Sequence, residues 1–278
     1  MSDKFGEIFK RSCIREKTHL SERKLLKNIR KGFENQEFKM YLQFIVDSKE
    51  GKISSAETLS RWENSSGEIV FPGTYIGIME KSGLITRFDY YMFEKVCEKL
   101  SQWKDSQYSD ISLSCNLTRI TISEKDFAEK IKEISNKYDF DRSKLVIEIT
   151  EDSLEKNLVV AMLNIIEIKK LGFRISLDDF GSGYTSLVSL CEYPIDVVKI
   201  DREILLLAGT EKGKKLFSGI VSLAHYLHLK VVCEGVETEE QNKLVLESEC
   251  DYIQGWYYTK ALKEDKAEEF AKEYMTKN

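Results

Sequence analysis

Apolar residues follow two different spacings along the chain from residue 39 onward. Short apolar runs have the length of strands, and the longer segments between them repeat apolar residues at helical spacing. The predicted strands span residues 40–46, 52–59, 111–116, 145–149, 173–177, 197–200 and 230–233, with a short one near Tyr252. The predicted helices span residues 74–81, 85–102, 127–137, 158–171, 214–227, 239–247 and 265–274. Such alternation is typical of crossover units in a mostly parallel sheet.

Eight predicted strands fit a closed barrel better than an open sheet. The connection between the first two is too short for a crossover helix, so we expect these two strands to pair antiparallel. The chain has 278 residues, close to the roughly 250 of a single α/β barrel. The predicted fold class is therefore α/β, a TIM-like (β/α)8 barrel with an antiparallel first strand. We assign residues 25–278 to this domain and residues 1–24 to a leader helix or linker.

Composition narrows the class of protein further. Hydrophobic residues make up 42% of the chain and charged residues 32%, which argues against global disorder. The net charge of -5 gives no reason to expect DNA or other nucleic acid as the main partner. No apolar run approaches the roughly 18 residues of a membrane span, and the N-terminus lacks a signal-peptide core, so we expect a cytoplasmic chain. Six scattered cysteines without a Cys-x-x-Cys pair predict reduced core residues.

Polar side chains mark the ends of seven of the predicted strands. These residues are Glu57, Asn116, Glu148, Asp178, Asp179, Lys199, Asp201, Glu234, Glu237 and Gln254. In a parallel barrel the carboxyl ends of the strands meet at one rim, where barrel enzymes carry their active sites. The sequence therefore predicts one acidic mouth.

Two adjacent carboxylates, Asp178 and Asp179, follow an apolar run and enter a glycine-rich bend. Taken alone, this stretch fits a solvated turn and a metal site equally well. Within the whole set, oxygen ligands without a histidine–cysteine cluster favour Mg²⁺ or Mn²⁺ over zinc. Paired acids can bridge two metals that clamp an in-line displacement at phosphorus. Lys199 would then hold the water or neutralise a phosphate oxygen, and Arg61 offers a planar fork for a phosphate.

The triplet Asp179-Phe180-Gly181 also matches the metal-binding motif of protein kinases. A kinase needs in addition a glycine-rich phosphate loop, a lysine on its third strand and a His-Arg-Asp catalytic loop. The sequence has none of these, so we set this interpretation aside.

In the order of its motifs the chain resembles the EAL-domain family of cyclic di-GMP phosphodiesterases. The naming motif reads Glu57-Thr58-Leu59-Ser60-Arg61, with Thr58 in place of the usual Ala. The other matching segments are residues 41–47, with Phe44 where Pro is usual, and residues 114–117, 148–151, 178–187, 198–201, 234–237 and 254–255. The resemblance covers about residues 25 to 265.

The resemblance implies a role for each matching residue. The implied ligands of two Mg²⁺ or Mn²⁺ ions are Glu57, Asn116, Glu148, Asp178, Asp179 and Glu234. Lys199 would orient the nucleophilic water, so the implied catalytic residues are Lys199, Glu234, Asp179 and Glu57. The implied substrate-binding residues are Gln43, Arg61, Asp201, Glu237 and Gln254, and Glu151 would brace the loop Gly181 to Ser186. Trp256, Tyr257 and Tyr258 could line a guanine pocket or pack at the rim.

The implied reaction is hydrolysis of cyclic di-GMP to linear 5'-pGpG, with inhibition by Ca²⁺. The alternative is a catalytically silent receptor for cyclic di-GMP, and a third interpretation is an interaction module that binds no nucleotide. Intact Asp178, Asp179, Glu148 and Lys199 favour the enzyme. The family also implies a homodimer, and an upstream regulatory domain or partner is a further expectation.

Overall fold

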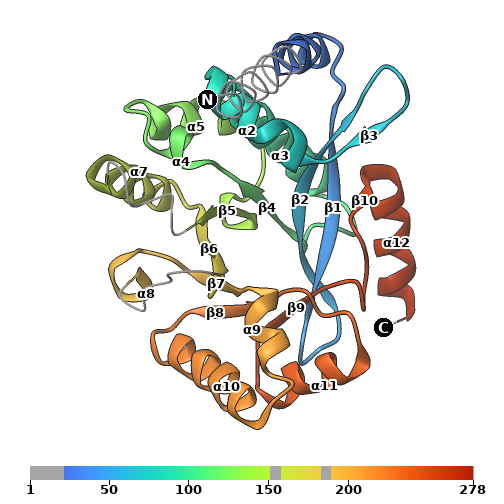
Figure 1. Cartoon of the computed structure of the whole chain (residues 1–278), viewed down its shortest axis with the longest axis vertical. Coiled ribbons are helices and arrows are strands. Elements are labelled where there is room, and N and C mark those ends of the chain that lie inside the picture. The colour runs from blue at the N-terminus through green and yellow to red at the C-terminus, as the bar shows by residue number, and fades with distance from the viewer. Residues whose placement is uncertain (1–21, 151–157, 183–188, 278) are drawn as a thin grey trace, which may run out of the picture. The chain divides into compact units, whose positions relative to one another are not determined.

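The computed structural model describes residues 22–150, 158–182 and 189–277. By its internal contacts the chain divides into two compact units. The described residues of Met1–Lys39 and Ser60–Ile85 form one, and those of Met40–Leu59 and Thr86–Asn278 form the other. Figure 1 shows the elements of both units.

The first unit is built around aromatic side chains. A helix covers residues 22–34 and buries Ile29 and Phe33. The Phe38 ring, where strand β1 (Phe38–Asp47) begins, lies 5.6 Å from the Trp62 ring and 5.4 Å from the Tyr75 ring. The remaining elements of this unit are the end of β2 (Ile53–Glu63), the short β3 (Ile69–Val70) and α2 (Pro72–Ser82). Of the segment predicted to be a leader or linker, the structure describes only residues 22–24, which form the first turn of the helix over residues 22–34.

The second unit is the barrel. Its further strands are β4 (Ser112–Asn116), β5 (Leu145–Thr150), β6 (Arg174–Phe180), β7 (Val197–Ile200), β8 (Lys230–Cys233) and β9 (Tyr252–Gln254). The order β1-β9-β8-β7-β6-β5-β4-β2 closes on itself because β1 also pairs with β2. β2 and β4 to β9 are parallel neighbours, whereas β1 is antiparallel to β9. The predicted TIM-like barrel with an antiparallel first strand is confirmed.

All seven predicted helices are present with small shifts of their ends. In addition to α2 they are α3 (Ile85–Trp103), α5 (Phe127–Ser135), α7 (Leu158–Lys170), α10 (Glu211–Tyr226), α11 (Glu239–Glu247) and α12 (Glu264–Lys277). α11 begins with a capping box, in which Thr238 and Gln241 bond each other's backbone amides.

The prediction missed several short elements. These are α4 (Arg119–Ile122), α8 (Ser189–Glu192), α9 (Arg202–Leu207), the 3-10 helix η1 (Arg142–Lys144), β3 and β10 (Leu262–Lys263). Such elements are too short to carry a hydrophobic period. α9 is marked by its N-cap residue rather than by a hydrophobic period. The side chain of Asp201, directly before the helix, accepts a hydrogen bond from the Glu203 amide at 2.7 Å.

Four of the five described cysteines agree with the prediction of reduced core residues, and Cys191 does not, because it is exposed. Cys97, Cys115, Cys233 and Cys250 are free and buried, and Cys191 is free and exposed. Burial raises the pKa of the Cys97, Cys115, Cys233 and Cys250 thiols. Cys13 lies outside the described residues. No helix in the described ranges is long and apolar enough to span a membrane.

Candidate active site

The carboxyl ends of the parallel strands bring four of the predicted acids around one lysine. The Lys199 ammonium is 2.6 Å from Glu234 Oε1 and 2.9 Å from Asp178 Oδ1. It is also 3.2 Å from Glu57 Oε2 and 3.2 Å from Glu148 Oε1. Lys199 is 1% exposed. One buried cation therefore faces four carboxylates, and the cluster has more negative charge than the protein itself neutralises.

Two amide side chains fix the orientation of Glu57. Asn116 donates from Nδ2 to Glu57 Oε1 at 2.9 Å, and Gln254 donates from Nε2 to Glu57 Oε2 at 2.7 Å. Asn116 closes β4 and Gln254 closes β9, so both amides reach Glu57 from strand ends. Burial alone would raise the Glu57 pKa, but Lys199 and these two amides outweigh it and lower the pKa.

A local irregularity of β6 separates the two adjacent aspartates. The pairing of β6 with β7 shifts register between Leu177 and Phe180, and Asp179 has a left-handed φ of 56°. Aspartate tolerates this conformation better than most residues, and such bulges re-aim side chains near active sites. Asp178 contacts Lys199, whereas Asp179 is exposed. Carboxylate oxygens of Asp178, Asp179 and Glu234 still lie within 4.8 Å of one another, close enough to share a metal ion.

The excess negative charge appears in the pKa values of the acids. Burial raises the pKa of Glu234 to about 8 despite the attraction of Lys199, with Asp178 adding repulsion. Burial also raises the pKa of Glu148 well above its usual range. The pKa of Asp179 rises to about 6 because its carboxyl is partly desolvated, although the residue as a whole is exposed, and because Asp178 repels its negative charge. Lys199 remains charged, because the four acids raise its pKa against the opposing effect of burial.

The donor set fits a divalent metal. Carboxylate oxygens of Asp178, Asp179 and Glu234 meet at the mouth of the barrel, beside the buried Lys199 cluster. Unneutralised buried carboxylates are costly, and a hard cation held by these three acids would balance the excess negative charge. His225 does not contribute to this site, since it bonds Asp251 at 2.7 Å instead. The structure therefore favours the metal-site interpretation of the Asp178-Asp179 stretch over a solvated turn.

A cleft of about 350 Å³ opens above this cluster. The predicted residues that line it are Gln43, Glu57, Asp178, Asp179, Glu234, Glu237 and Gln254. Trp256 also lines the cleft and is 61% exposed, with the Lys260 ammonium 4.7 Å from its ring centre. Tyr258 instead donates from its hydroxyl to Asn242 at 2.8 Å. Of the two interpretations of these aromatics, Trp256 fits ligand contact and Tyr258 fits packing.

Arg202 also lines the cleft, although the sequence pattern did not predict it as a site residue. Its Nη2 donates to Glu237 Oε2 at 2.7 Å. Its side chain lies against Gly235, where an added Cβ would be 2.5 Å from Arg202 Cγ. The signal for Arg202 was its place directly after Asp201, at the end of a predicted strand.

Three predicted residues are placed neither in the lining of the cleft nor in the Lys199 cluster. Asp201 caps α9 and is not among the lining residues. Arg61 belongs to the first unit, where its guanidinium lies 4.8 Å from the Phe71 ring centre and donates to the Ser60 carbonyl at 2.8 Å. Glu151 lies outside the described residues, as does most of the loop Gly181 to Ser186.

The barrel and its acidic mouth define a class of protein, a β/α-barrel with a candidate metal site. Comparison with known proteins identifies the family. The chain matches the EAL domain over residues 26–261, and it therefore belongs to the EAL domain family.

Curated relatives agree with this assignment. The chain is 32% identical to the signaling protein YkoW of Bacillus subtilis, over 87% of this chain and 30% of that protein. It is 29% identical to the bifunctional diguanylate cyclase/cyclic di-GMP phosphodiesterase MucR of Pseudomonas aeruginosa, over 84% of this chain and 34% of MucR. The chain thus spans about a third of the length of these relatives.

Solved structures are similar as well. The chain superposes on the MucR phosphodiesterase in complex with c-di-GMP with a TM-score of 0.82 and 27% identity, covering 88% of this chain and 99% of that one. It superposes on the EAL enzyme Bd1971, bound to cAMP and cyclic di-GMP, with a TM-score of 0.84 and 26% identity, covering 92% and 70%.

Proposed function

We propose that the chain is a metal-dependent cyclic di-GMP phosphodiesterase that produces linear 5'-pGpG. The observation that supports it most is the buried group of four acids within 3.2 Å of Lys199. A silent receptor needs only a cleft for the nucleotide. It would gain nothing from burying this costly excess of negative charge.

The proposed metal ligands are the acids and amide of the mouth, namely Glu57, Asn116, Glu148, Asp178, Asp179 and Glu234. Two Mg²⁺ or Mn²⁺ ions held there would activate water and stabilise negative charge developing at phosphorus. Lys199 keeps its proton and serves as a fixed hydrogen-bond donor to the water or to a phosphate oxygen. The hydrogen bonds from Gln254 and Asn116 hold the Glu57 carboxylate in the orientation of a metal ligand.

The cleft residues provide the proposed substrate contacts. Gln43, Gln254 and Arg202 offer hydrogen-bond donors for a dinucleotide, and Arg202 is oriented by Glu237. The exposed face of Trp256 offers a surface on which a guanine base can stack. Arg61 and Asp201 keep the substrate-binding roles that the family resemblance implies.

A hydrolysis assay tests the proposal. The purified chain is incubated with cyclic di-GMP and Mg²⁺ or Mn²⁺, and the linear product is separated by chromatography. Glu57→Ala removes a proposed metal ligand and should abolish turnover, whereas the exposed control Glu247→Gln should leave it unchanged. Ca²⁺ should inhibit, since its larger and looser coordination suits a two-metal displacement poorly. Binding of cyclic di-GMP by wild type without any turnover would instead establish the silent receptor.

We also propose a homodimer that uses the exposed side of α7. Val159, Leu163 and Ile166 lie on one face of this helix and are 71%, 57% and 36% exposed. Leu163→Asp should give a monomer in sedimentation velocity, while the control Lys170→Ala should keep the dimer. A monomeric wild type would contradict the proposal. A cytoplasmic location and control by an upstream domain or partner complete the proposed function.

A further inference from the structure

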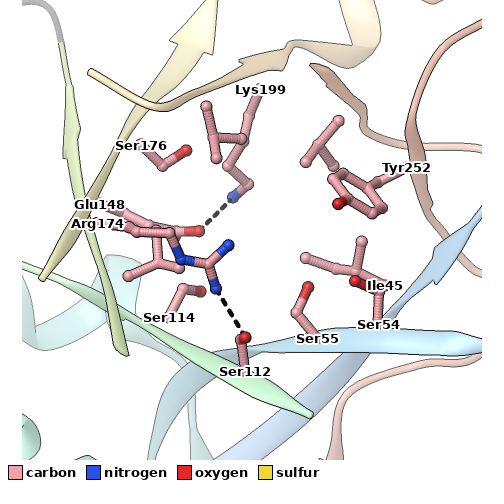
Figure 2. A pocket seen from close by; sticks show the side chains of 13 residues that line it. Ile45, Ser54, Ser55, Ser112, Ser114, Glu148, Arg174, Ser176, Lys199 and Tyr252 are labelled. Carbon is pink, nitrogen blue, oxygen red and sulfur yellow. Dashed lines mark hydrogen bonds and ion pairs between the residues drawn. The ribbon is translucent and has the colours of Figure 1, made fainter. Parts of the chain in front are cut away.

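A second cavity lies inside the barrel below the Lys199 cluster. One side of it is apolar, where Ile45, Val197 and Val232 pack with Tyr252. The other lining residues include serines from β2, β4 and β6 with Glu148, Arg174 and Lys199. Figure 2 shows the serine hydroxyls, Glu148 and Lys199 around this space. Barrel interiors are usually filled by bulky branched residues. The small serine side chains instead leave a polar cavity here, which is uncommon.

Three buried polar atoms line this cavity without a partner. Among the described residues, Ser114 Oγ, Ser176 Oγ and Glu148 Oε2 form no hydrogen bond. These residues are 4%, 1% and 2% exposed. Ser176 is the register neighbour of Glu148 on the adjacent strand. Orphaned buried groups of this kind are rare and costly, and three of them around one cavity indicate a shared partner.

Arg174 also lines the cavity. Its Nη2 donates to Ser112 Oγ at 2.7 Å and its Nε donates to the Ser143 carbonyl at 2.7 Å. Of the two dashed lines in Figure 2, one marks the bond from Arg174 to Ser112 and the other marks the ion pair between Lys199 and Glu148. A cation inside the cavity would meet the positive charge of Arg174, and an anion would meet the Glu148 carboxylate. A neutral molecule that both donates and accepts satisfies all three orphaned atoms.

We propose that this cavity is an ordered water site, and that Ser114 and Ser176 position the Glu148 carboxylate through the water. The cavity offers about 40 Å³ to the centres of water molecules, more than the roughly 10–15 Å³ that one water requires. A water there accepts from the serine hydroxyls and donates to Glu148 Oε2, while Glu148 Oε1 remains bound to Lys199. The positioning role rests on the proposed function, because it treats Glu148 as a metal ligand.

The variant Ser114→Ala/Ser176→Ala tests both parts. A high-resolution crystal structure of the metal-free wild type should show water within hydrogen-bond distance of Ser114 Oγ, Ser176 Oγ and Glu148 Oε2. The double variant should lose this water and unfold at a lower urea concentration. Calorimetric titration should show that its Kd for Mn²⁺ is weaker by about tenfold, as for other residues that orient metal ligands. Ser54→Ala is the matched control, since Ser54 lines the same cavity and should change neither quantity.

The outcomes separate this inference from the proposed function. A dry cavity, an ion in place of water, or a double variant that binds Mn²⁺ like wild type would overturn it. If wild type binds Mn²⁺ and holds the water but cleaves no cyclic di-GMP, the water site stands and the proposed enzyme fails. If wild type cleaves cyclic di-GMP but its cavity contains no water, the proposed enzyme stands and the water site fails.

Discussion

The two ends of strand β8 carry charged clusters with opposite balance. At its start, Asp251 accepts from Lys230 Nζ at 2.7 Å, from His225 Nε2 at 2.7 Å and from the Val231 amide at 3.0 Å. Beyond its end, Glu234 is one of four acids that share Lys199. One carboxylate has three partners, whereas four carboxylates share one cation.

The pKa values record this difference. Burial opposes ionisation of Asp251, yet its three partners prevail and lower its pKa. Burial of Glu234 prevails over Lys199 and raises its pKa to about 8. A cluster that satisfies its own charge stabilises the fold. A cluster with unneutralised negative charge is suited to bind a positively charged ligand. This agrees with the general arrangement of β/α-barrels, in which the face at the carboxyl ends of the strands carries activity and the opposite face contributes stability.

Removing the central cation should have the largest effect. Lys199→Met leaves four buried acids without their counter-charge, so we expect the metal-free chain to lose about 3–5 kcal/mol of unfolding free energy in urea. Hydrolysis of cyclic di-GMP should also be lost. The control Lys170→Met breaks an exposed pair with Glu167 and should cost under about 1 kcal/mol. Equal losses in both variants would show that Lys199 does not hold the cluster together.

Divalent metal should bind and stabilise only the cluster around Lys199, and not the cluster around Asp251. At a Mn²⁺ concentration of 100 times its Kd, the unfolding free energy should rise by about 2.7 kcal/mol. Asp178→Asn should abolish most of this gain, because it removes a ligand of the group Asp178, Asp179 and Glu234. Asp251→Asn should retain the gain in full. Loss of the Mn²⁺ effect in Asp251→Asn would contradict the separation of the two clusters.

The sequence predicted which residues would meet but not how each is oriented. The barrel follows from alternating apolar segments, and closure of parallel strands then forces Glu57, Glu148 and Lys199 to one rim. The different directions of Asp178 and Asp179 depend on a register shift in β6, which no local pattern announces. Arg202 lines the cleft and pairs with Glu237, a contact between the first residue of α9 and the segment before α11 that only the folded chain creates.

Asp251 should contribute stability in a pH-dependent way. Asp251→Asn leaves partly buried donors without a charged acceptor, and we expect it to cost about 1–3 kcal/mol in urea at neutral pH. Because the folded pKa is lowered, this contribution is full above the unfolded pKa of about 3.9 and is lost as the pH falls through the folded value. The gap between wild type and variant should therefore shrink below about pH 4. A gap that is constant with pH would show that the ionised form of Asp251 is not what matters.

The smallest effect should come from one partner of the satisfied cluster. His225→Ala removes one of three donors to Asp251, and the carboxylate keeps Lys230 and the Val231 amide. We expect a loss of about 0.5–1.5 kcal/mol, with hydrolysis of cyclic di-GMP unchanged, since His225 lies at the opposite end of β8 from Glu234. His228→Ala is the matched control. His228 adopts a left-handed φ of 61°, which alanine tolerates somewhat less well than histidine, so a loss of stability in His225→Ala beyond that in His228→Ala measures the contact with Asp251. If His225→Ala lowered activity while stability stayed constant, the Asp251 cluster would have to be counted with the active site.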